Sequence, residues 1–152
     1  MQKINLPSAI FALSALIAMA IGFWTRASLP IPRESGRLLG MLVFLSGMTL
    51  FTWASVYLKQ AFFGNIEPLT EQIVTDGPYR WMRHPLYLSM LIALIGFNLA
   101  LRSGWGMVGV LVLFLPSVVN RARLEDQAMQ KKFGSSWQEF AGRTFFLLPP
   151  IW

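Results

Sequence analysis

The chain has 152 residues, of which 55% are hydrophobic and only 13% are charged. A soluble domain of this length would expose much of that apolar surface to water, so the composition indicates an integral membrane protein. The absence of cysteine excludes disulfides and thiolate metal sites, and with a single histidine we expect no metal site at all. The net charge of +6 is explained by the positive-inside bias and by contact with anionic lipid, so we expect no nucleic-acid partner.

Four segments are apolar enough to span a bilayer, which predicts an all-α membrane protein with a single domain over residues 1–152. A helix needs about 20 residues to cross about 30 Å of hydrocarbon, so the last two segments are at the short limit. Only Arg102 and Ser103 separate these two, which predicts a tight antiparallel hairpin. Gly40 and Gly47 would let the second segment approach a neighbour closely. The four segments are residues 6–24, 36–58, 85–101 and 104–119.

The distribution of Lys and Arg predicts the orientation in the membrane. With four spans, the N-terminus, the loop 59–84 and the C-terminal tail share one side and carry nine of the 13 Lys and Arg residues. The opposite side carries the other four. The positive-inside rule therefore predicts that both termini are cytoplasmic. We place the protein in a bacterial inner membrane.

Residues 76–88 form the most unusual part of the sequence. They include three aromatic rings, two arginines and the only histidine, directly before an apolar segment. Pro85 suits the first turn of a helix, so His84 is expected near the cap, where free N–H groups suit a carboxylate or phosphate. An interfacial belt of aromatic rings and arginines at lipid headgroups explains the same composition equally well.

Residues 120–133 are charged and predict an amphipathic helix that directly continues the fourth apolar segment. Arg121 and Glu125 are four residues apart and therefore share one face, whereas Asp126 is turned about a quarter-circle away. Such charges usually form a solvated face held by modest ion pairs. This helix, however, is expected on the same side of the membrane as His84. A carboxylate there would hydrogen-bond a polar ligand, and an arginine would orient an acidic one.

Three motifs occur in a fixed order around the predicted hairpin: Gly77-Pro-Tyr-Arg, Arg83-His-Pro-x-Tyr-Leu88, and Arg121-x3-Glu125-Asp126 followed by Phe133-Gly134. In order and spacing they resemble the isoprenylcysteine carboxyl methyltransferase and phospholipid methyltransferase superfamily of integral membrane enzymes. The resemblance covers residues 64–140. Two positions depart from it: Asp126 replaces the usual second glutamate, and Ser89 stands where a glycine often follows.

The resemblance implies an S-adenosylmethionine-dependent methyltransferase, with residues 64–140 as the cofactor-binding and catalytic region. It assigns the acceptor to Arg121, and we take Arg121 and Glu125 as the candidate catalytic residues. Similar enzymes methylate carboxylates of prenylated cysteine, lipid amines or small thiols, so the acceptor stays open, although the apolar helices favour a lipid tail. The implied cofactor contacts are Gln72, Ile73, Val74, Tyr79, His84, Pro85, Leu86, Tyr87 and Glu125.

Methyl transfer from a sulfonium is an in-line displacement with a good leaving group, so it needs positioning and desolvation more than a covalent nucleophile. A site at the cytosolic membrane face would admit a polar cofactor from water and a lipophilic acceptor from the bilayer. Two other functions compete with this one. A small four-helix transporter needs a membrane-embedded carboxylate, and none of the four apolar segments contains Asp or Glu. A non-catalytic membrane scaffold is disfavoured by the retained motif residues and stays an alternative.

Overall fold

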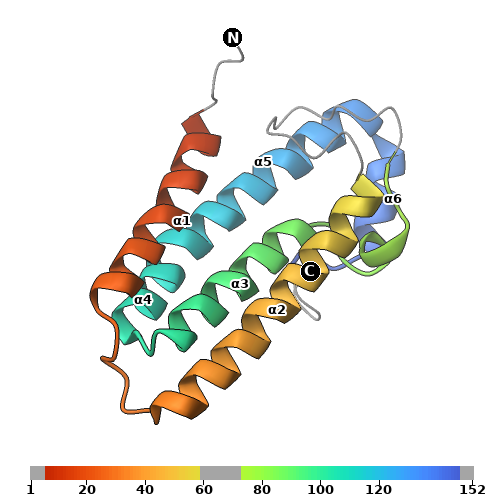
Figure 1. Cartoon of the computed structure of the whole chain (residues 1–152). Coiled ribbons are helices and arrows are strands. Elements are labelled where there is room, and N and C mark those ends of the chain that lie inside the picture. The colour runs from red at the N-terminus through yellow and green to blue at the C-terminus, as the bar shows by residue number, and fades with distance from the viewer. Residues whose placement is uncertain (1–5, 59–72, 148–152) are drawn as a thin grey trace.

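A computed structural model describes residues 6–58 and 73–147, and the regular structure in these ranges is helical apart from one isolated β-bridge. Helices α1 (Leu6–Trp24) and α2 (Arg33–Leu58) come first, and the short 3-10 helix η2 (Gly77–Arg80) precedes α3 (Pro85–Ala100) (Figure 1). A continuous helix follows, made of α4 (Gly104–Gly109), the π-helical turn η3 (Val110–Phe114) and α5 (Leu115–Phe133). Helix α6 (Ser135–Arg143) comes last. The predicted all-α membrane fold is confirmed.

Three of the described helices are long and apolar enough to cross a membrane: α1, α2 and the continuous helix of residues 104–133. Helix α3 is apolar but has only 16 residues, which corresponds to about 24 Å at 1.5 Å per residue. It is therefore the shortest of the four helices that correspond to the predicted spans. Helix α5 extends well beyond the start of α3 (Figure 1). The polar residues of α5 thus lie beside the N-terminal end of α3.

Helices α2 and α3 pack against each other through glycines, which confirms the close approach predicted for α2. A Cβ atom added to Gly40 would lie 2.2 Å from the backbone nitrogen of Ala100. A Cβ atom on Gly96 of α3 would lie 2.3 Å from the backbone nitrogen of Phe44. At both positions the obstacle is a backbone atom, so only glycine lets the two helices come this close.

We expect Gly96→Val to destabilise the fold, because the added side chain has to push α2 away from α3. Overpacking of this kind costs about 1–3 kcal/mol, and thermal unfolding in detergent would show it as a lower melting temperature. Gly142→Ala is the matched control, since a Cβ atom there meets nothing within 4 Å. An unchanged melting temperature for Gly96→Val would contradict the close helix contact.

Helix α1 packs on the continuous helix through a stripe of small buried residues, Ser14, Ala18 and Gly22. The hydroxyl oxygens of Ser14 and Ser117 lie 2.7 Å apart, so one hydrogen bond joins α1 to α5 inside the apolar region. Small residues that allow close contact, reinforced by hydroxyl groups, are the usual means by which helices associate in a membrane.

The π-helical turn η3 ends at Phe114, two residues before Pro116. Pro116 itself lies in the first turn of α5. Proline has no N–H group and its ring interferes with the preceding turn, so it normally interrupts a helix. A local π-helical adjustment is one way in which membrane helices tolerate proline. The helix therefore continues through this point and carries the charged residues of α5 to the end of α3.

Candidate functional site

His84 is at the N-cap of α3 and Pro85 occupies the first turn, as the sequence predicts. The imidazole does not cap the helix, and His84 is only 4% exposed. Its ring lies 5.6 Å from the ring of Tyr87 and 5.2 Å from that of Phe146, measured between centroids. The only histidine is therefore a fixed, buried group, and its two ring nitrogens face α5.

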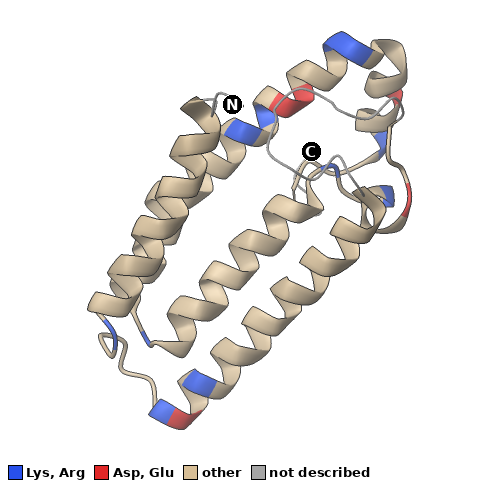
Figure 2. Cartoon of the chain, turned by 45° about the horizontal axis from the view of Figure 1, so that its top comes forward, with Lys and Arg blue, Asp and Glu red and all other residues tan. Residues whose placement is uncertain are grey.

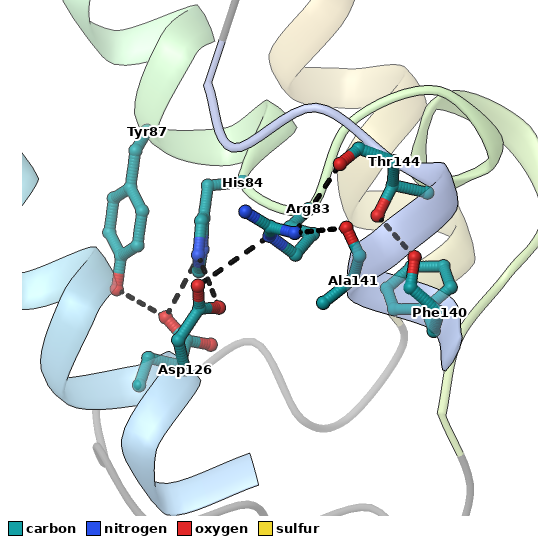
Figure 3. Close-up of polar contacts among 8 residues, drawn as sticks. Arg83, His84, Tyr87, Asp126, Phe140, Ala141 and Thr144 are labelled. Atoms are coloured by element: carbon teal, nitrogen blue, oxygen red, sulfur yellow. Dashed lines mark hydrogen bonds and ion pairs between the residues drawn. The ribbon is translucent and has the colours of Figure 1, made fainter. Parts of the chain in front are cut away.

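Two carboxylates of α5 meet the first turn of α3 (Figure 3). A carboxylate only accepts hydrogen bonds, so His84 Nε2 donates to Asp126 Oδ1 over 2.9 Å. The Tyr87 hydroxyl donates to Glu125 Oε2 over 2.8 Å, and that oxygen lies 3.8 Å from His84 Nδ1. Asp126 directly follows Glu125 and therefore points about a quarter-circle away from it around α5. His84 nevertheless contacts both carboxylates.

Arg121 lies one turn before Glu125 and is 8% exposed. Its Nε donates to the Tyr87 hydroxyl over 2.8 Å, so this hydroxyl connects Arg121 with Glu125. The guanidinium also donates to the Ser8 hydroxyl of α1 and lies 5.4 Å from the centre of the Phe11 ring. Residues of α1 and α3 thus hold this arginine of α5 in one orientation.

Arg83 has a positioning role that its motif does not reveal. Its NH1 donates to the carbonyl oxygens of Ala141 and Thr144, over 2.6 and 3.3 Å, at the C-terminal end of α6 (Figure 3). Its Nε lies 3.5 Å from Asp126 Oδ2. Arg83 therefore ties α6 to the carboxylate that holds His84.

The segment after α6 covers the same end of α3. The backbone N–H of Arg83 donates to the Phe145 carbonyl, and the N–H of Phe145 donates to the Trp81 carbonyl. This pairing, a parallel bridge between Met82 and Phe145, places the Phe146 ring against His84. No sequence motif marks the segment, because its pairing with residues 81–83 is made by backbone groups.

Tyr79 of η2 is buried at this end of the molecule, with 6% exposure. Burial, and after it the negative charge of Glu125, raise the pKa of Tyr79 above its ordinary value, so the phenol stays protonated. The remaining implied cofactor contacts have these positions: Pro85 is buried, Ile73, Val74 and Leu86 are half-buried, and Gln72 lies outside the described residues.

The site lies at one end of the helical bundle. In the part of the chain that the structure describes, charged residues gather at the two ends of the bundle (Figure 2). The middle portions of the described helices, between these ends, carry none. At the site end both signs occur together, with Arg83 and Arg121 beside Asp126 and Glu125. Such an arrangement can bind a cationic group and an anionic group side by side at the edge of an apolar region.

Comparison with known proteins finds sequences that are similar to this chain. Residues 36–136 match the family described as phospholipid methyltransferase, a range that includes nearly all of α2, then α3 and the continuous helix, but not α1. A stretch of 97 residues is 29% identical to the lamin-B receptor of Drosophila melanogaster. The alignment covers 59% of this chain and 13% of the receptor, so the chain spans only a small part of that relative's length.

Proposed function

Because this chain belongs to the phospholipid methyltransferase family, we propose that it transfers a methyl group from S-adenosylmethionine to a lipophilic acceptor at the cytosolic face of the membrane. The family supports a membrane methyltransferase that acts on lipid. The observation that carries the proposal is the meeting of His84 and Tyr87 from α3 with Arg121 and Glu125 from α5. The excess of Lys and Arg on the predicted inner side supports the cytosolic orientation.

The acidic side of the site suits the cofactor, which carries positive charge on its sulfonium and amino groups. The Glu125 side chain is 38% exposed, compared with 23% for Asp126. The contacts from Tyr87 and His84 both approach Oε2 of Glu125, so we assign Oε1 to the cofactor. When bound, the cofactor supplies an electrophilic methyl group, and the chain's residues need only place and desolvate the two reactants.

Arg121 suits the acceptor. A guanidinium has five donors in a planar fork, which matches the oxygens of a carboxylate or phosphate. The Tyr87 hydroxyl, the Ser8 hydroxyl and the Phe11 ring fix its orientation before any ligand arrives. A fixed donor loses little freedom on binding, so it holds an acceptor head group in a defined position next to Glu125.

Cofactor binding is the first test. We expect purified protein in detergent to bind S-adenosylmethionine or its demethylated product with micromolar affinity. A ligand at about 100 times its dissociation constant should stabilise the fold by about 2.7 kcal/mol, which thermal unfolding would record. Calorimetry without heat, together with unfolding that neither ligand alters, would refute the proposal and favour the scaffold alternative.

A further inference from the structure

Helix α1 presents two neighbouring stripes of residues. One is the small-residue stripe that packs on the continuous helix. The other faces the site and the space between α1 and α2. Its members are separated by three, four and four residues, so they lie on one face and extend over about 16 Å along the helix. They are Ser8, Phe11, Ala15 and Met19.

The first half of this second stripe builds the site. Ser8 receives a hydrogen bond from Arg121, and the Phe11 ring lies edge-on to the Tyr87 ring with a centroid distance of 5.5 Å. Both contacts come from outside the family match, which begins at residue 36. The surroundings of Arg121 are therefore completed by a helix that the family match does not include.

The second half of the stripe lines a cavity of about 250 Å³ between α1, α2 and α3. Ala15 and Met19 form its α1 wall, and Met48 and Met90 are among the residues opposite. The cavity surface is entirely apolar. The one hydroxyl among the lining residues, that of Ser89, is buried and donates to a carbonyl of its own helix.

Arg121 and the cavity contact neighbouring turns of α1 and α3. Phe11 and Tyr87 contact Arg121, and Ala15 and Met90, one turn further along the same two helices, line the cavity. All four residues pack against the same buried cluster. A dry apolar cavity of about 150 Å³ already binds benzene in a soluble protein, and a membrane supplies hydrocarbon chains directly. Methionines in the wall adapt to chains of different shape.

We propose that the acceptor is an amphiphilic lipid whose head group faces Arg121 and whose hydrocarbon chain occupies the α1–α2–α3 cavity, and that α1 selects it. This inference rests on the proposed function, since it names the kind of acceptor and the helix that recognises it. A specific acceptor site differs from a surface that binds bulk membrane lipid, because the fit of one hydrocarbon chain in the cavity should depend on Ala15 and Met19.

A photoreactive lipid tests this occupant even while the acceptor itself is unidentified. The probe is phosphatidylethanolamine with a diazirine in the middle of one chain, added to the purified protein in detergent. We expect labelling of the peptides that contain Met48 and Met90. Ala15→Phe fills the cavity and should reduce that labelling about tenfold, which corresponds to about 1.4 kcal/mol, whereas Met19→Ala widens it and should raise labelling by longer or branched chains.

Ala12→Phe is the matched control, because Ala12 is exposed on the same helix and lines no part of the cavity. Thermal unfolding of each variant shows that it is folded. Labelling that spreads over all exposed helix faces and ignores both Ala15→Phe and Met19→Ala means bulk lipid only and overturns the inference. If cofactor binding persists in that case, the proposed function stands. Absence of cofactor binding removes the proposed function, and the acceptor role with it, whatever the labelling shows.

Discussion

Replacing Arg121 with alanine is expected to reduce kcat for methyl transfer by about 100-fold, because a misplaced acceptor loses the near-attack geometry. Cofactor affinity should change little, since the contact assigned to the cofactor is made by Glu125. A small loss of cofactor affinity is still expected, because the Tyr87 hydroxyl bonds to both Arg121 and Glu125. The measurement is kcat and KM for an acceptor found by screening lipids with labelled cofactor, with the cofactor dissociation constant from calorimetry.

Two further variants sharpen this prediction. Arg121→Lys keeps the charge but loses the planar fork that reaches both Tyr87 and Ser8, so its kcat should be intermediate. Arg123→Ala should leave kinetics unchanged, because that side chain is exposed two residues away. A variant of Arg121 that loses cofactor binding yet keeps full turnover at saturating cofactor would contradict the division of roles between Arg121 and Glu125.

The helices were predictable because their signals are local. The apolar run 6–24 coincides with α1, and Pro85 marks the first turn of α3. Helix α2 begins at Arg33, three residues before its apolar segment, because charged residues can form a first turn that hydropathy does not detect. The sequence also predicted the continuation of the fourth segment into a charged helix. Local patterns do not specify which helix faces meet. The residues that the α2 glycines contact are therefore known only from the structure.

The structure brings several candidate site residues together, but the contacts between them could not be predicted from the sequence. Spacing places Arg121 and Glu125 on one face, and the structure adds that Tyr87 bonds to both. A helical wheel locates residues around α5 but not the position of the neighbouring helix, so it could not show that His84 lies within reach of Asp126. The bond from Arg121 to Ser8 joins residues 113 apart, and that from Arg83 to Ala141 ends on a backbone carbonyl. Neither bond can be predicted from the pattern of residue types in the sequence.

The two adjacent acids of α5 should differ in what they control. Glu125→Gln removes the charge that faces the cofactor, so we expect affinity to fall by about 1.5–3 kcal/mol, which is about 10- to 150-fold. The melting temperature should hardly change. The Glu125 side chain is 38% exposed, and a glutamine oxygen still accepts the bond from Tyr87.

Asp126→Asn should instead act on the fold. The asparagine oxygen still accepts from His84 Nε2, but the Arg83 side chain, which is 10% exposed, loses its nearby negative charge. Leaving a buried charged group poorly compensated costs about 1–3 kcal/mol, so the melting temperature should fall while cofactor affinity changes less than in Glu125→Gln. Gln127→Ala, at an exposed neighbour, is the control for both. Equal losses of affinity in the two variants would make Asp126 a cofactor ligand, and an unaffected Glu125→Gln would show that Glu125 does not hold the cofactor.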